Sequence, residues 1–438
     1  MVDPPVDPVD EGGADGVAGG AESPALRRIV SLPWLVLYGL GSTVGAGIYV
    51  LTGVVAGRAG RLAPLAFMLA AAVAMLTASS FAELSARFPW AGGALVYVRE
   101  GLRSRSLSVT VGLLAATAGV ISAATVSLGF VGYFAQLVAL PSGVVLAAVV
   151  LGVGGLAAWG VRESVVAAGL VTLLEVTGLL AVLAFGVAHL VFGDPHALGP
   201  MAGATLSEPL SRELGMGTVL AVLSSTVLCF FAFLGFEDMV NVAEEVRDVR
   251  RAMPRAIYWT LGLATVLYVS IALVSTRVVA PLELGQHEAP LSLVFERSGG
   301  SPAILSLIAL LAMLNGALVQ MIMASRILFS LARDGPLPGF LGRVHPDRRT
   351  PLAATALVTS MVGLLAAALP LESLAAATAS VALGVFALVH VSLFVILRRE
   401  ASSPAQAGGG RSLPIAIPAL GALTSLGLLA VELRARLP

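Results

Sequence analysis

Long apolar runs separated by short polar stretches dominate the chain from about residue 30 onward. A helix needs about 20 predominantly apolar residues to cross a bilayer, whereas a membrane β-barrel shows short alternating segments. Eleven runs approach or exceed that length, at residues 32–57, 62–86, 107–138, 143–160, 165–192, 217–243, 256–280, 302–331, 351–370, 373–397 and 413–433. The pattern therefore predicts an all-α integral membrane protein with about 11 transmembrane helices.

The first and the sixth of these runs are interrupted near mid-membrane. Four glycines fall within Gly39–Gly47, and Gly235 followed closely by two acidic residues falls within the sixth run. Glycine weakens a helix by roughly 1 kcal/mol relative to alanine. Irregular backbone persists at membrane depth only where protein buries it or where it lines a cavity, which favours helices opened toward a ligand. Because Gly41 and Gly45 form a G-x-x-x-G pair, a close-packing seam is the alternative for the first run.

The spacing of the two interruptions bears on this choice. The second interruption lies five runs after the first, as expected if spans 1–5 and spans 6–10 form two related halves of inverted topology. In such transporters, paired interruptions mark a site near the membrane midplane. Helix N-termini attract a carboxylate there, and free carbonyl groups accept hydrogen bonds from an ammonium group. An α-amino acid carries both groups, so the pattern favours an amino acid site.

Composition and charge refine this picture. The chain is 57% hydrophobic and 12% charged, about half the charged share of a soluble protein. All 26 basic residues are arginine. If the N-terminus is cytoplasmic, eighteen of these arginines lie in loops and helix ends on the inner side and seven on the outer side, as the positive-inside rule expects. Residues 1–25, rich in proline, glycine and acids, are expected to form a disordered cytoplasmic tail. The single Cys229 provides neither a disulfide nor a cysteine-based metal site.

The loops carry little that an enzyme needs. The longest external loops, at about residues 193–216 and 281–301, contain no nucleophile paired with a base, no phosphate-binding glycine loop and no cluster of metal ligands. The five histidines are scattered, and only His390 lies well inside a span. We therefore expect no enzymatic activity, no cofactor, no metal ion and no nucleic-acid partner.

Four stretches, in order, resemble the motifs of the amino acid–polyamine–organocation (APC) transporter superfamily, especially its cationic-amino-acid-transporter-like branch. They are GSTVGAGIY at 41–49, FAELSARFP with GG and YVRE at 81–100, FAFLGFE with EEVR and MPRAI at 231–257, and SR with ARDG and RTP at 325–351. The match covers about residues 30–400. Four ordered motifs are more specific than one glycine cluster, so the resemblance disfavours a packing seam alone.

The resemblance implies a leucine-transporter-like fold, in which ten core helices form two inverted repeats and helices 1 and 6 are interrupted. On this expectation residues 26–400 form the transporter core, with repeats at about 30–192 and 217–398. Residues 401–438 would form a linker and an additional C-terminal transmembrane helix. The resemblance also implies secondary transport of amino acids or related amines.

By motif position, the resemblance implies a site built mainly from backbone atoms. The N–H groups of Ala46 and Gly47 would hold the substrate carboxylate, and the carbonyl groups of Thr43, Phe231 and Leu234 would receive the ammonium. Phe231 would also act as an aromatic gate, with core or lipid packing as the alternative. The residues expected at the substrate are Ser42, Thr43, Gly45, Ala46, Gly47, Phe231, Ala232, Leu234 and Gly235.

Two acidic residues inside the predicted spans are candidates for proton coupling. Glu175 lies about ten residues into the fifth span, roughly 15 Å deep, where an unpaired carboxylate costs several kcal/mol. In some proton-coupled relatives a lysine near this place carries the proton, and this chain has no lysine. Glu175 is therefore interpreted as a proton-coupling group, a neutral group hydrogen-bonded between helices, or a recognition group for a cationic side chain. Glu237, just past the second interruption, either couples protons or stabilises the unwound segment.

Other polar residues leave the substrate open. Asn315 and Gln320 in the eighth span serve either an interhelical hydrogen bond or the substrate side chain. The sequence thus favours a multi-pass amino acid permease of the plasma membrane, of the bacterial inner-membrane type, driven by a proton gradient. A sodium-coupled symporter, an exchanger and a non-transporting amino acid sensor are the alternatives. The kind of amino acid, cationic or neutral, and the oligomeric state stay undetermined.

Overall fold

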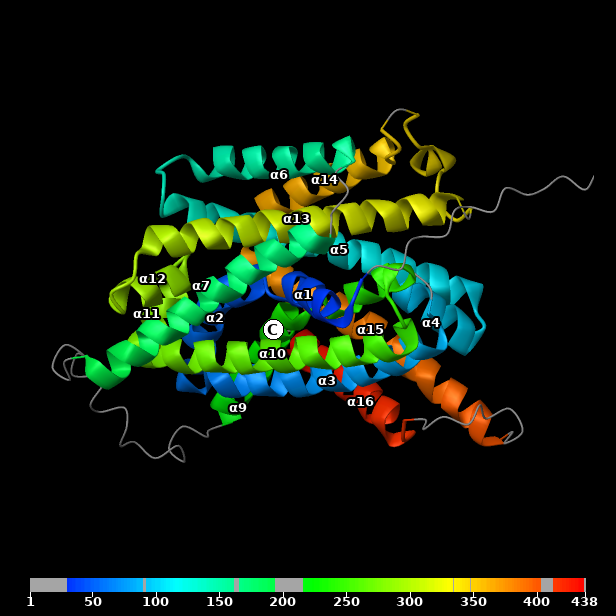
Figure 1. Cartoon of the computed structure of the whole chain (residues 1–438), viewed down its shortest axis with the longest axis horizontal. Coiled ribbons are helices and arrows are strands. Elements are labelled where there is room, and N and C mark those ends of the chain that lie inside the picture. Colours follow the sequence, from blue (N-terminus) through cyan, green and yellow to red (C-terminus); the bar gives the residue numbers. More distant parts are fainter. Residues whose placement is uncertain are drawn as a thin grey trace, which may run out of the picture.

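A computed structural model describes most of the chain after the N-terminal tail (Figure 1). The predicted disordered tail, residues 1–25, lies outside the described residues. The described residues are 30–89, 92–160, 165–193, 216–333, 335–346, 348–402 and 413–436. Across these ranges the chain forms helices and no β-strand, so the prediction of an all-α protein is confirmed.

The helices follow the apolar runs of the sequence. The first half of the chain contains α1 (Leu32–Thr43), α2 (Ala46–Ala59), η1 (Gly60–Leu62), α3 (Ala63–Arg87), α4 (Gly93–Leu102), α5 (Arg105–Ala135), α6 (Ser142–Trp159) and α7 (Val165–Phe192). The second half contains α9 (Met216–Phe233), η3 (Phe236–Glu245), α10 (Val249–Val278), α11 (Pro281–Gln286), α12 (Pro290–Arg297), α13 (Pro302–Arg333), η4 (Gly339–Gly342), α14 (Leu352–Ala368), α15 (Leu371–Ser402) and α16 (Ala416–Arg436).

Every one of the eleven apolar runs coincides with helical structure, but the number of membrane crossings stays a prediction. Within the described ranges, nine helical stretches are long and apolar enough to cross a membrane. That number treats Ala46–Arg87, which contains α2, η1 and α3, as one stretch. It also leaves out α14, an apolar helix of 17 residues.

Both predicted interruptions are confirmed, and they differ in form. Between α1 and α2 the backbone is extended at Val44 and Gly45. After α9 the chain turns at Gly235, whose φ of 119° is one that side-chain-bearing residues rarely adopt. The chain then continues as the 3₁₀-helix η3 of 10 residues, well beyond the usual length of this kind of helix. The second half of the sixth run is therefore wound more tightly than an α-helix.

The helix contacts fall into corresponding pairs. Helix α3 packs against α10, α5 against α13, and α6 against α14, which joins the second, third and fourth apolar runs to the seventh, eighth and ninth. Helix α1 packs against α10 and α7, and α9 packs against α3 and α15 in the corresponding way. In Figure 1, α1 lies between the α3–α10 layer and the α5–α13 layer, with α6 and α14 at the outer edge. This pattern supports the predicted relation between the two halves.

The short helices lie at opposite ends of the bundle (Figure 1). Helix α4, which follows α3, packs against α15 and η3. Helix α11, which follows α10, packs against α2, and the neighbouring α12 packs against α2 and α7. The last helix, α16, packs against α15, α3 and α9. Short helices thus pack at each end of the bundle, α4 at one end and α11 with α12 at the other, and the two broken helices lie between the two ends.

Candidate functional site

The two interruptions meet in the middle of the bundle. The hydroxyl of Ser42, near the end of α1, lies 2.9 Å from the carbonyl oxygen of Gly235 and 3.0 Å from that of Gly39. A Cβ atom added at Gly235 would collide with the carbonyl oxygen of Ser42. On the other side of the first break, a Cβ atom at Gly47 would lie 2.5 Å from Ala232 Cα. Glycine is thus required at both points of close backbone approach.

A cavity of about 50 Å³ lies at this meeting point. It is lined by Tyr38, Gly41, Ser42, Thr43, Gly45, Ala46, Gly47, Ser122, Val126, Phe231, Leu234, Asn315, Gly316, Val319 and Gln320. Seven of the nine residues predicted at the substrate belong to this lining. The other two, Ala232 and Gly235, pack behind it against Gly47 and Ser42. The structure therefore brings the predicted residues together, and their contact with a substrate stays a prediction.

The backbone around the cavity offers groups of both polarities. Helix α2 begins at Ala46, and its N-cap residue, Gly45, has no side chain to accept hydrogen bonds from the first turn. The first N–H groups of a helix have no partner within it, so Ala46 and Gly47 present donors. Helix α9 ends at Phe233 and its last carbonyl groups are the complementary acceptors.

Two of the predicted ammonium acceptors already receive a hydrogen bond. The Phe231 carbonyl accepts one from the Leu234 N–H at 3.1 Å, and the Thr43 carbonyl accepts one from the Tyr268 hydroxyl at 2.9 Å. A carbonyl oxygen has two lone pairs, so each retains capacity for another donor. The hydrogen bond from Tyr268 was missed from the sequence because this tyrosine lies far along the chain, on α10.

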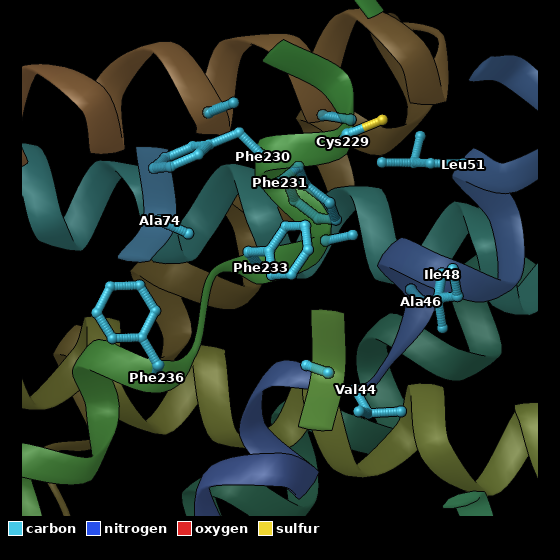
Figure 2. Close-up of a cluster of buried hydrophobic side chains, with 14 of the residues drawn as sticks. Val44, Ala46, Ile48, Leu51, Ala74, Cys229, Phe230, Phe231, Phe233 and Phe236 are labelled. Carbon is cyan, nitrogen blue, oxygen red and sulfur yellow. The ribbon is translucent and has the colours of Figure 1, made fainter. Parts of the chain in front are cut away.

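The aromatic residues on either side of the second break do not all face the cavity. Phe231 lines it and is only 6% exposed. Phe230 and Phe236 instead make edge or tilted contacts with Phe386. Figure 2 shows the unwound stretch after Phe233 opposite the break that contains Val44, with Phe230 and Phe236 on the side of Ala74. Phe231 is therefore placed where the predicted gate would act.

Glu175 lies beside the first break but does not line the cavity. It is 1% exposed, and neither of its carboxyl oxygens has a hydrogen-bond partner among the described residues. The hydroxyl of Tyr49 lies 3.5 Å from the backbone oxygen of Glu175, and Tyr133 donates to the backbone oxygen of Tyr49 at 2.8 Å. Both tyrosine hydroxyls are thus used by backbone acceptors, and so is that of Tyr268. A buried carboxyl without a partner is energetically costly in its charged form.

The two acids after the second break have partners. Glu237 Oε2 accepts a hydrogen bond from the Gly235 N–H at 2.8 Å, a contact that stabilises the turn. Asp238 Oδ2 accepts one from Gln320 Nε2 at 3.3 Å, a partner for Gln320 that was not predicted from the sequence. This hydrogen bond ties η3 to α13 beside the cavity.

A much larger vestibule of about 840 Å³ adjoins the cavity. Ser122, Leu234 and Gln320 line both spaces, so the two are neighbours. The vestibule is lined by α4, the start of α5, the end of α13 and the middle of α15, which places it toward the α4 end of the bundle. Glu237 and Asp238 lie on its wall.

The opposite end of the bundle is tightly packed. A Cβ atom at Gly53 of α2 would lie 2.5 Å from the carbonyl oxygen of Leu284 in α11. One turn further along, a Cβ at Gly57 would lie 3.0 Å from Gly285 Cα. The described structure therefore gives the cavity a wide neighbouring space on the α4 side and close helix packing on the α11 side.

His390 has a structural environment. Its Nδ1 lies 2.8 Å from the Ser80 hydroxyl and its Nε2 lies 3.3 Å from that of Thr77. The Thr77 hydroxyl also donates to the Val73 carbonyl at 3.1 Å, so it accepts from Nε2–H and Ser80 donates to Nδ1. A Cβ at Gly421 of α16 would collide with the imidazole ring. The histidine thus joins α15, α3 and α16.

The fold and the site together define a class. The protein is a multi-pass helical membrane protein with a small cavity between two broken helices and a vestibule on one side of it. Residues 30–432 match the family described as amino acid permease, and the chain belongs to this family, within the APC superfamily. It is therefore an amino acid transporter and not an enzyme.

Curated relatives agree with the family and carry diverse names. The branched-chain amino acid permease BcaP of Bacillus subtilis is 28% identical over 413 residues, covering 89% of this chain and 85% of that protein. The methylthioribose transporter of the same organism is 27% identical over 402 residues (87% and 83%). The mitochondrial cationic amino acid transporter 3 of Arabidopsis thaliana is 29% identical over 395 residues (85% and 62%). These names do not define one substrate.

Proposed function

We propose that this protein is a secondary active transporter that moves amino acids across the plasma membrane by alternating access. The observation that carries the proposal is the cavity between the two breaks, with a helix N-terminus on one side and a helix C-terminus on the other. The repeated packing pairs of the two halves support two inverted repeats, which would allow one half to rock against the other.

The site binds the two groups common to all α-amino acids. The N–H groups of Ala46 and Gly47 receive the carboxylate, because the start of α2 carries unpaired donors and the positive end of the helix dipole. The carbonyl groups of Thr43, Phe231 and Leu234 receive the ammonium. Phe231 closes over the bound molecule. Recognition through backbone atoms explains why small residues fill both breaks.

The α4 end of the bundle faces the cytoplasm. Arg99, Arg105 and Arg326 line the vestibule at this end. The loops and helix ends expected inside carry eighteen arginines against seven outside. In this orientation the vestibule opens inward and the packing of α2 against α11 closes the outer side. The structure then corresponds to an inward-facing state.

A proton drives transport, and Glu175 carries it. The carboxyl is enclosed beside the break in α1, where α7 packs against α1, and it has no cationic partner among the described residues. Two tyrosines connect its surroundings to the first break, because the Tyr49 hydroxyl lies 3.5 Å from the Glu175 backbone oxygen and the Tyr268 hydroxyl donates to the Thr43 carbonyl at 2.9 Å. Glu237, which bonds the Gly235 N–H, stabilises the second break instead.

Uptake into liposomes tests the proposal. Purified protein is reconstituted and offered a panel of labelled amino acids under an imposed proton gradient, a sodium gradient or neither. We expect accumulation that follows the proton gradient and needs no sodium. Accumulation only under a sodium gradient would identify a sodium-coupled symporter. Uptake only when unlabelled amino acid is present inside the liposomes would identify an exchanger. Binding without uptake would contradict transport and indicate a sensor.

A further inference from the structure

We infer that the substrate has a small, neutral side chain, which occupies a compartment formed by Ser122 and Val126 of α5 and by Asn315, Gly316 and Val319 of α13. This side-chain compartment is the part of the cavity lining that comes from α5 and α13 and not from the two broken helices. The inference rests on the proposed function, because it takes the backbone groups of the breaks as the site of the carboxylate and the ammonium. With those groups held at the breaks, the side chain extends toward α5 and α13.

The charge of the lining excludes an ionised side chain. Among the described residues that line the cavity, Tyr38 is the only one with an ionisable side chain. Three acids lie around the cavity without lining it: Glu175 is enclosed beside the first break, and Glu237 and Asp238 lie on the vestibule wall, where they accept hydrogen bonds from the Gly235 N–H and from Gln320. A buried charge without a partner is costly by several kcal/mol. Lysine-like or arginine-like side chains would therefore bind poorly.

The size of the compartment limits the side chain further. A cavity of about 50 Å³ holds roughly four water-sized groups at 10–15 Å³ each. The carboxylate and the ammonium bind at the broken helices, so the volume on the α5 and α13 side suits a short side chain. The absence of a side chain at Gly316 widens the compartment. A Cβ atom there would have one neighbour within 4 Å, Val126 Cγ1 at 4.0 Å. The vestibule offers more room, but it must close when the substrate is enclosed.

Two polar groups of the compartment are available to a substrate. Within the described residues, neither the Ser122 hydroxyl nor the Asn315 amide takes part in a hydrogen bond. Both can donate and accept, so they fit a substrate hydroxyl or amide, and a water molecule can satisfy them beside an aliphatic side chain. The compartment therefore fits small aliphatic, hydroxyl and amide side chains.

Competition binding with purified full-length protein in detergent tests the inference. Unlabelled alanine, serine, valine, leucine, lysine, arginine and glutamate compete against the labelled amino acid that binds best. We expect the neutral amino acids alanine, serine, valine and leucine to compete at least tenfold more strongly than lysine, arginine or glutamate. Stronger competition by lysine or arginine would overturn the inference and leave the proposed function intact. If the folded protein bound no amino acid at all, the proposed function itself would fail.

Variants of the compartment sharpen the test. Gly316→Val narrows the compartment, and we expect it to weaken binding of valine or leucine at least tenfold more than binding of alanine. Val126→Ala widens it and should shift the preference toward larger neutral side chains. Gly155→Val is the matched control, because Gly155 is exposed on α6 and a Cβ there meets no atom within 4 Å. An unchanged profile in both compartment variants would overturn the inference.

Discussion

The substitution Gly47→Ala tests the close approach of the two broken helices. The added Cβ would lie 2.5 Å from Ala232 Cα and 2.8 Å from Ala232 Cβ. Ordinary van der Waals separation begins at 3.4 Å, so α2 and α9 must separate by about 0.9 Å or distort. Because the obstacle is backbone, it cannot rotate away. Overpacking of this kind costs about 1–3 kcal/mol, which corresponds to a roughly 5- to 150-fold loss of affinity if it acts on the bound geometry.

Equilibrium binding of a labelled amino acid to the purified variant measures this effect, and thermal unfolding in detergent shows how much of the cost falls on the fold. Gly155→Ala is the matched control and should change neither quantity, because its Cβ meets no atom within 4 Å. Adding Ala232→Gly to Gly47→Ala removes the clash with the side chain of residue 232 but keeps the clash with its backbone, so we expect partial recovery. Wild-type affinity and stability in Gly47→Ala would show that α2 and α9 do not approach this closely.

Three further substitutions probe the second break, the buried acid and the buried histidine. Gly235→Ala places a side chain at a φ of 119° and against the Ser42 carbonyl, so uptake should be lost and the unfolding free energy should fall by about 1–3 kcal/mol; normal uptake would contradict this. Glu175→Gln should preserve substrate binding and abolish accumulation driven by a pH gradient, and retained accumulation would remove Glu175 from the coupling mechanism. His390→Leu leaves the buried Ser80 hydroxyl without its partner and removes one of the two hydrogen bonds of Thr77, so it should lower the unfolding free energy by about 1–3 kcal/mol with unchanged substrate affinity; an altered affinity would mean that the histidine serves the site.

The helical class and the two breaks were predictable because they depend on local sequence. Apolar runs of membrane-spanning length determine the helices, and the glycines of the first run and Gly235 determine where two of them open. The exact form of the second break was not predictable. The structure continues it as the 3₁₀-helix η3, and nothing in the amphipathic pattern of residues 236–245 distinguishes that winding from an α-helix.

The backbone side of the site was predictable from motifs, and the side-chain side was not. Ser122, Val126 and Val319 reach the cavity only because α5 and α13 pack against each other. In the sequence they are ordinary members of apolar helices. The same holds for Tyr268, whose hydrogen bond to the Thr43 carbonyl joins residues 225 positions apart. Such contacts follow from tertiary packing, which single-sequence periodicity does not encode.

A structure of the full-length protein with a bound amino acid would show whether the backbone of the two breaks forms the substrate site. We expect the carboxylate within hydrogen-bond distance of the N–H groups of Ala46 and Gly47, the ammonium at the carbonyl groups of Thr43, Phe231 or Leu234, and the side chain between α5 and α13. An amino acid bound away from the two breaks, or bound there with its carboxylate held by side-chain cations, would contradict the backbone-built site.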